Sequence, residues 1–304
     1  MRRLLLIANA IAYRTTAYQR EVIPRALAAE FKVDVIQTSR PGSAIDLARQ
    51  AAHDGVDIVA ALGGDGTVNE VANGLARTDS SLAILPAGMA NVFARSLGIP
   101  DDPIEATGWL VENPEAAPKR VPLGRVNDRY FTVSCGVGLD AAIVREVERR
   151  QRAKKRVGDW FFVWSGLRVF FRDYDRRKPR IAVSWGAGPD ERKDGLFLAI
   201  AQNTAPYTYF RNQAMRLSPD AELDGGLDLL GLDSLKTRVA ISVVLRAFRS
   251  AGHVRRRHTI YVRGQRRFEV RCDEPLPVQV DGEFIGEHER LSIESVPAAL
   301  GVLY

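Results

Sequence analysis

The sequence has few cysteines and histidines and no long apolar segment. Cys135 and Cys272 are the only cysteines, too few for a disulfide framework and typical of a reducing cytosol. The four histidines show no spacing typical of metal ligands, and we expect His253 and His258, which flank an arginine run, at the surface. No apolar run is long enough to span a bilayer, and the N-terminal run is too short for a signal peptide. These absences predict a cytoplasmic protein.

The charge of the chain is the next constraint. Its 304 residues carry a formal net charge of +6, and 46% of them are hydrophobic. The hydrophobic content allows a sizeable core. The positive charge favours an anionic partner, such as nucleic acid, an acidic membrane or a phosphorylated ligand, although arginine also serves solubility alone. No recognised nucleic-acid motif is present, so no nucleic acid is expected.

The first third of the chain alternates between apolar runs and helical spacing. The spacing predicts strands at 4–8, 33–37, 56–62 and 82–85, and helices at 16–31, 43–53, 68–76 and 91–97. Strands that are apolar throughout and separated by helices are typical of a doubly wound parallel sheet. The N-terminal part is therefore predicted to be an α/β domain.

After Pro118 strand-like runs predominate. Asn127–Asp128 is a hairpin signal, and two helical stretches, 158–174 and 236–250, interrupt the strands. Further strands are expected at 180–185, 196–201, 227–232, 259–263, 268–272 and 278–280. This pattern predicts a second, antiparallel β domain with a boundary near residues 118–122.

Two glycine-containing turns follow neighbouring predicted strands. In 63–66 (GGDG), glycine allows a close approach by a ligand, and the next helix presents free N–H groups that suit phosphate. Asp65 would repel a phosphate unless a cation lay between them, which points to metal-bound nucleotide. The alternative is a plain turn in which Thr67 and Glu70 form a capping box. Pro86 and Gly88 mark the second turn, which could form the other side of one nucleotide crevice.

Five stretches together resemble the diacylglycerol kinase catalytic family, which includes bacterial soluble lipid kinases, sphingosine kinases and ceramide kinases. They are 63–75 (GGDGTVNEVANGL), 85–100 (LPAGMANVFARSLGIP), 133–141 (VSCGVGLDA), 221–230 (AELDGGLDLL) and 280–283 (VDGE). The resemblance implies an ATP-binding α/β domain, a β-sandwich domain for the lipid substrate, and a C-terminal segment that returns to the first domain. These parts would occupy residues 1–120, 121–290 and 291–304.

The resemblance also implies functional residues. Glu283 would be the proton acceptor and Asp65 would hold the metal at the phosphates, although 280–283 also fits a tight hairpin turn. A structural Mg²⁺ would lie in the loop of Ala221, Asp224 and Gly226. Met89 and Val92 stand where the family has polar residues. The ATP-binding residues would be Asn9, Thr38, Gly64, Asp65, Gly66, Thr67, Val68, Asn69, Glu70, Gly88 and Met89.

The implied activity is transfer of the γ-phosphoryl group of Mg-ATP to a lipid hydroxyl, with diacylglycerol as the expected acceptor and phosphatidic acid as the product. Alternatives are a kinase for sphingoid base, ceramide or phosphatidylinositol, an NAD kinase-like enzyme, and a non-catalytic protein that binds nucleotide and membrane. The expected partner is a lipid substrate at an anionic membrane surface, reached by peripheral association. A homodimer is compatible with this reading.

The stretch 149–179 combines arginines with aromatic residues. Trp160, Trp164, Leu167 and Phe171 fall on one helical face, and neighbouring apolar residues widen it. A helix this apolar is predicted to be buried. The alternative is an interfacial helix with its aromatic face in lipid and its arginines against anionic headgroups.

Overall fold

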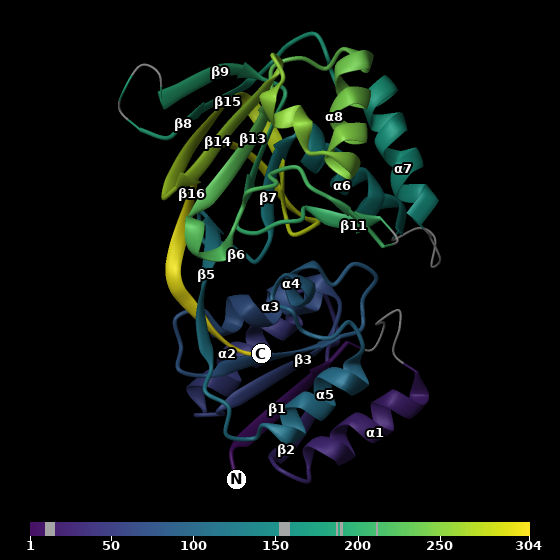
Figure 1. The fold of residues 1–304 in the computed structure, drawn as a ribbon, viewed down its shortest axis with the longest axis vertical. Helices are drawn as coiled ribbons and strands as arrows, with labels where there is room; N and C mark the ends of the chain where they lie inside the picture. The colour runs from purple at the N-terminus through teal and green to yellow at the C-terminus, as the bar shows by residue number, and fades with distance from the viewer. Residues whose placement is uncertain (10–15, 152–158, 187, 189–190, 211) are drawn as a thin grey trace. The chain divides into compact units, whose positions relative to one another are not determined.

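The computed structural model describes residues 1–9, 16–151, 159–186, 188, 191–210 and 212–304. They form two compact units (Figure 1). Unit 1 consists of Met1–Leu123 and Val296–Tyr304, and unit 2 of Gly124–Ser295. No helix in the described part of the chain has the length and hydropathy needed to cross a bilayer.

Unit 1 is built on a parallel sheet. Its central strands are β1 (Arg3–Ala8), β3 (Ile58–Gly63) and β4 (Ser81–Pro86), and β2 (Lys32–Gln37) pairs with β1 at one edge. The end of β16 (Glu283–Leu303) adds to β4 in parallel, so the last residues of the chain complete this sheet. The central strands are buried almost throughout because helices cover both faces, whereas β2 is largely exposed.

The helices of unit 1 largely follow the predicted pattern, with two differences. One is α5, which was not predicted and begins where the Asp102 carboxylate caps the N–H groups of Ile104 and Glu105. The other is α3, which begins at Asp65, directly after the glycine turn, rather than at Val68. The helices are α1 (Ala17–Leu27), α2 (Ser43–His53), α3 (Asp65–Leu75), α4 (Val92–Ser96) and α5 (Pro103–Glu112).

Unit 2 is a β-sandwich whose two sheets share the long strand β15 (Arg267–Val280). The first half of β15 pairs with β8 and the second half with β7. Along its other edge, β15 pairs with β16, with a shift of register between Arg271 and Leu276. The two predicted runs 268–272 and 278–280 are therefore parts of one strand. The core between the sheets contains Phe131, Val137, Leu229 and Phe268, all fully buried. The other strands are β5 (Lys119–Val126), β6 (Arg129–Phe131), β7 (Ser134–Gly138), β8 (Ile181–Ser184), β9 (Arg192–Leu196), β10 (Leu198–Gln202), β11 (Thr208–Phe210), β12 (Gln213–Met215), β13 (Leu227–Leu232) and β14 (Thr259–Gln265).

Helices cover the outer face of one of these sheets. Phe170 and Val243 pack there against Ile200 and Leu230, which point outward from the sheet. The hairpin predicted at Asn127–Asp128 is confirmed, because it joins β5 to β6. The helical segments of unit 2 are α6 (Leu139–Gln151), which was not predicted, α7 (Asp159–Arg168), the π-helical turn η1 (Val169–Asp173), α8 (Thr237–Arg249), and the 3₁₀ turns η3 (Leu223–Gly225) and η4 (Gly252–Arg255).

Two sequence-based expectations about burial in unit 2 are wrong. Trp164, Leu167 and Phe171 were expected inside a buried helix, but each is about half exposed, because only the opposite side of the segment packs on the sheet. The side chains of residues 160–163 lie outside the described residues. His253 was expected at the surface and is fully buried, with its Nε2 atom 2.8 Å from the carbonyl oxygen of Leu217. Burial lowers the pKa of His253.

Candidate active site

The glycine turn of unit 1 lies where the buried strand β3 ends and α3 begins. Gly64 is the N-cap residue of α3. Because it has no side chain that could accept a hydrogen bond, the backbone N–H groups of the first helical turn are not capped by it. The neighbouring strand β4 ends beside it, because the Ala87 N–H donates to the carbonyl oxygen of Gly63 over 2.8 Å. The turns after β3 and β4 are therefore in direct contact, as the sequence predicted.

Close packing explains three of the glycines in these turns. A Cβ atom on Gly88 would lie 2.5 Å from the Cα atom of Gly64, and one on Gly64 would lie 3.0 Å from the Cα atom of Gly88. A Cβ atom on Gly63 would lie 2.5 Å from the hydroxyl oxygen of Thr67. Side chains on Gly64 and Gly88 would push the two turns apart, and one on Gly63 would clash with Thr67, so glycine is required by the protein itself.

Gly66 is different, because a Cβ atom there would meet no protein atom within 4 Å. Gly66 is exposed and lies in the first turn of α3, where alanine would be the better helix former by roughly 1 kcal/mol or less. Nothing in the fold therefore demands glycine at this position. A free surface of bare backbone at a helix N-terminus is suited to the close approach of a phosphate group.

Asp65 lies between the two turns. Its Oδ1 atom is 3.5 Å from the N–H of Phe93 in the first turn of α4, so the carboxylate faces the start of that helix. Asn91 shapes the second turn from inside, because it bonds Gly88 in both directions and donates to Asp101 over 2.6 Å. Asp65 is half-buried, and one cation beside it would be shared with a phosphate at the N-terminus of α3.

Asn9 and Thr38 follow the neighbouring strands β1 and β2. The side-chain amide of Asn9 donates to the Thr67 hydroxyl over 3.0 Å, which places Asn9 directly against the glycine turn. Thr38 lies one strand further out, where its N–H donates to the carbonyl oxygen of Ala8. Both side chains are half-buried at the carboxyl edge of the sheet, where parallel sheets bind ligands.

The side chains of three residues assigned to nucleotide binding are engaged within the protein. The Glu70 carboxylate accepts bonds from the N–H groups of Gly42 and Ala44, so it caps α2 rather than α3. The capping box expected between Thr67 and Glu70 is therefore wrong. The side chains of Val68 and Asn69 are buried, like that of Thr67. Met89 is half exposed at the tip of the second turn.

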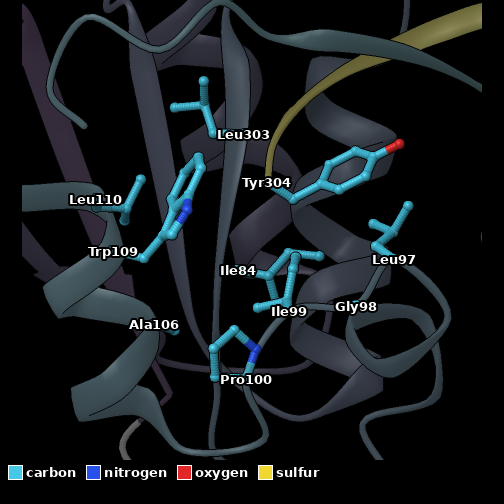
Figure 2. Close-up of a pocket in the computed structure, with 10 residues that line it drawn as sticks. All are labelled: Ile84, Leu97, Gly98, Ile99, Pro100, Ala106, Trp109, Leu110, Leu303 and Tyr304. Carbon is cyan, nitrogen blue, oxygen red and sulfur yellow. The ribbon is translucent and has the colours of Figure 1, made fainter. Parts of the chain in front are cut away.

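A separate pocket of unit 1 lies against β4 and α5 (Figure 2). Trp109 and Tyr304 lie on either side of Ile84, and no charged side chain lines the space. Its volume of about 80 Å³ is below the roughly 300 Å³ at which ligand pockets begin. The pocket lies where the end of β16 meets α5, and it is too small for a nucleotide.

In unit 2 the predicted hairpin between β15 and β16 is formed by Asp281 and Gly282, both with left-handed backbone conformation. The Asp281 carboxylate accepts four hydrogen bonds of 2.7–2.9 Å, from the N–H groups of Thr132, Val133 and Ser134 and from the Thr132 hydroxyl. Asp281 therefore clamps the loop between β6 and β7 onto this turn. The clamp fixes the position of Glu283, two residues later.

Glu283 begins β16 and remains partly open to solvent. Its Oε2 atom is 2.7 Å from a guanidinium nitrogen of Arg129, and the Glu283 side chain is 40% exposed. An ion-paired, accessible carboxylate can accept a proton from a hydroxyl that approaches it. Arg129 was not identified from the sequence, although it directly follows the predicted Asn127–Asp128 turn.

Behind the turn lies a buried polar network that sequence reasoning also missed. The Asp140 carboxylate accepts from the Tyr207 hydroxyl at 2.7 Å and from the Gln279 amide at 2.8 Å. The Gln279 side-chain oxygen in turn accepts from the Gly282 N–H. Burial raises the pKa of Asp140, and the two hydrogen bonds offset part of that rise. The network holds the turn that precedes Glu283 in place. In the sequence, Asp140 was recognised only as part of the 133–141 stretch.

The loop expected to hold a structural Mg²⁺ borders a space of about 330 Å³, which Asp220, Glu222 and Asp228 help to line. Ala221 is buried, Asp224 is exposed, and Gly226 adopts a left-handed conformation against Gly264. Across the described residues, no three His, Cys, Asp or Glu side chains gather as a metal site. Arg263 already ion-pairs with Asp220 beside this loop at 3.6 Å. The resemblance implies a Mg²⁺ held largely by backbone oxygens of this loop, and that structural metal stays a sequence-based prediction.

Comparison with known proteins follows this division into two parts. A family model described as the diacylglycerol kinase catalytic domain matches residues 3–126. A second, described as the YegS C-terminal NAD kinase beta sandwich-like domain, matches residues 133–304, more than half of the chain.

Individual relatives match over most of their length. The chain is 29% identical over 291 residues to a diacylglycerol kinase of Bacillus subtilis (strain 168), covering 94% of this chain and 91% of that protein. It is 26% identical over 262 residues to a diacylglycerol kinase of Staphylococcus aureus (strain JH9), covering 85% and 78%. A crystal structure of a diacylglycerol kinase from Bacillus anthracis str. Sterne superposes with a TM-score of 0.71 at 20% identity, covering 99% of this chain and 96% of that one, which shows a shared fold.

Proposed function

Because the chain belongs to the diacylglycerol kinase-like family of lipid kinases, we propose that it transfers the γ-phosphoryl group of Mg-ATP to the free hydroxyl of diacylglycerol. The product would be phosphatidic acid. The names of the relatives from Bacillus subtilis and Staphylococcus aureus support diacylglycerol as the acceptor. We further propose peripheral association with the membrane that holds this acceptor.

The observation that carries the nucleotide half of the proposal is Gly66. It is an exposed glycine in a helix, with open space where its side chain would be, and this supports a ligand that approaches the bare backbone there. The N–H groups of the first turn of α3 would hold phosphate oxygens there. Asn9 and Thr67 lie against the same turn and would complete the contacts.

Asp65 and magnesium would have different electrostatic roles. The Mg²⁺ that arrives with ATP neutralises charge on the transferring phosphoryl group. Asp65 is the carboxylate at this turn with access to such an ion, and a carboxylate oxygen is a preferred magnesium ligand. Its proposed role is to hold the metal–phosphate complex at the turn.

Glu283 is proposed as the general base. A lipid hydroxyl is a weak nucleophile until a carboxylate takes its proton. The Asp281 clamp and the Asp140 network hold the Glu283 turn rigid, which suits a residue whose position must be fixed before the acceptor binds. Arg129 would orient the carboxylate through its ion pair.

The test combines an acceptor screen with one substitution. Purified protein is incubated with radiolabelled ATP, Mg²⁺ and mixed micelles of diacylglycerol, ceramide, sphingoid base or phosphatidylinositol, with NAD as a soluble acceptor. Label in phosphatidic acid supports the proposal, and label in NADP alone contradicts it. Glu283→Gln should lower kcat by about 10²–10⁴-fold and leave ATP affinity near that of the unsubstituted protein. Equal losses of rate and ATP affinity would show that Glu283 acts in nucleotide binding instead.

A further inference from the structure

Two helical segments of unit 2 expose large apolar side chains in rows. On α8, Ile241, Val244 and Leu245 are 54%, 43% and 50% exposed. On α7 and η1, Trp164, Leu167 and Phe171 are 46%, 53% and 52% exposed. A surface helix of a soluble protein normally turns such residues toward the core, and here both helices also present them outward. We refer to these six residues as the apolar face.

The two rows belong to one surface. Beneath them, Phe170 of η1 and Val243 of α8 pack into the same buried cluster over the sheet. Arg176 follows η1 and reaches the hydroxyl of Thr237, at the start of α8, over 3.4 Å. Figure 1 shows α7 and α8 beside each other on this unit. The two segments that carry the apolar face are therefore joined by shared buried packing and by one hydrogen bond at their ends.

The border of the apolar face is rich in arginine. Arg238 and Arg249 are exposed on α8, which contains no acidic residue. Beside the other segment, the guanidinium of Arg150 on α6 lies 4.7 Å from the centre of the Trp164 ring and ion-pairs with Glu146. Arg172 is exposed beside Phe171. Asp173, the acidic residue within η1, is ion-paired with Arg168 at 3.2 Å. The surface thus combines an apolar centre with a positive rim.

We propose that the apolar face docks on the surface of an anionic lipid bilayer, with its apolar side chains at the acyl boundary and its arginines against headgroup phosphates. This rests on the proposed function in one respect: a diacylglycerol acceptor lies in a bilayer. Rows of Leu and Ile with a Trp at the edge match the interfacial region, and basic side chains add attraction to anionic lipid. A second copy of the chain fits less well, because face-to-face pairing would bring two positive rims together.

The test measures co-sedimentation with vesicles of phosphatidylcholine alone and of phosphatidylcholine with phosphatidylglycerol. Ile241→Gln/Leu245→Gln removes apolar contact with a helix-compatible residue and should weaken binding to anionic vesicles by about tenfold or more. Arg238→Gln/Arg249→Gln should weaken anionic binding by about fivefold for each arginine and leave neutral binding unchanged. Leu167→Gln repeats the apolar test on the other segment, in case the α8 variant fails to fold.

The matched control is Ile104→Gln, which removes an exposed isoleucine from helix α5 of unit 1 and should bind vesicles like the unsubstituted protein. Equal vesicle binding by the folded α8 variant and the unsubstituted protein would overturn the docking surface, whatever the acceptor lipid. A lipid-free dimer that becomes a monomer in the α8 variant would assign the face to self-association and also overturn it. If vesicle binding depends on the face but no lipid is phosphorylated, the docking surface stands and the proposed function fails. Activity on a short-chain diacylglycerol in free solution should be unchanged in all these variants.

Discussion

The Asp281 clamp allows a prediction with a magnitude. Asparagine at position 281 tolerates the backbone φ of 46° but has a single acceptor oxygen. If the amide NH₂ group faces Thr132, the hydroxyl can turn to accept from it, but the Thr132 N–H loses its partner. If it faces the other side, the N–H groups of Val133 and Ser134 both lose theirs. The first arrangement is cheaper and leaves one buried donor unsatisfied.

An unsatisfied buried donor costs about 1–3 kcal/mol, and loss of the charge on the remaining bonds adds about 1 kcal/mol. Asp281→Asn should therefore lower the free energy of unfolding by about 2–4 kcal/mol, measured by urea denaturation followed with circular dichroism. Asp281→Gly separates two explanations. If Asp281 served only the turn geometry, glycine would relieve the left-handed strain and stabilise the protein. If the carboxylate is the clamp, glycine must be at least as destabilising as asparagine.

The matched control is Asn127→Gly in the hairpin between β5 and β6. Asn127 has a similar φ of 49°, but its side chain accepts one exposed hydrogen bond, from Ser292 at 3.2 Å. This variant should unfold within about 1 kcal/mol of the unsubstituted protein. The clamp is refuted if Asp281→Gly is as stable as Asn127→Gly.

Three further predictions concern the glycine turn and the buried histidine. Gly66→Ala should keep or slightly raise the free energy of unfolding yet weaken ATP binding measured by calorimetry. Gly88→Ala should instead lower the free energy of unfolding by about 1–3 kcal/mol, because its Cβ atom would meet the Gly64 backbone. Unchanged ATP affinity in Gly66→Ala would count against a phosphate at this turn. Asp65→Asn should keep the melting temperature and lower kcat by about 10²–10³-fold, and near-normal turnover would remove Asp65 from the mechanism. Burial lowers the pKa of His253, so the unfolded chain takes up a proton at this histidine at a higher pH than the folded protein does. The stability contributed by the neutral His253 should be fully present above pH about 6.5 and should fall as the pH drops below that value. His253→Gln should flatten this part of the stability–pH curve.

Local signals in the sequence predicted local structure well. The predicted helix 43–53 matches α2 at both ends, and both hairpins were found because Asn127 and the Asp281–Gly282 pair suit left-handed turns. The glycine turn was recognised for the same reason, since a strand, a run of glycines and a helix are contiguous in the chain. α6 was missed because it begins directly after a strand without a conventional cap signal.

Partners that are distant in sequence could not be predicted. Glu70 was expected to serve α3, three residues away from Thr67, but it bonds the start of α2, more than 25 residues earlier. The Asp281 clamp joins residues almost 150 positions apart. His253 was placed at the surface because of the adjacent arginines, whereas its burial depends on the remote carbonyl of Leu217. Each of these results depends on the packing of whole elements, which a single local pattern does not encode.

The strand β16 has a consequence for how the chain is made. It spans 21 residues, begins at Glu283 in unit 2, and ends as the strand that covers β4 in unit 1. During synthesis, the residues up to Leu123 leave the ribosome long before Gly301–Leu303 are made, so this edge of β4 has no partner until those residues follow. An unpaired, buried-type strand edge is a site for wrong pairing with another chain. A nascent chain that stalls anywhere in Gly124–Ser295 would therefore leave this edge of β4 open to wrong pairing, and Gly301–Leu303 close it.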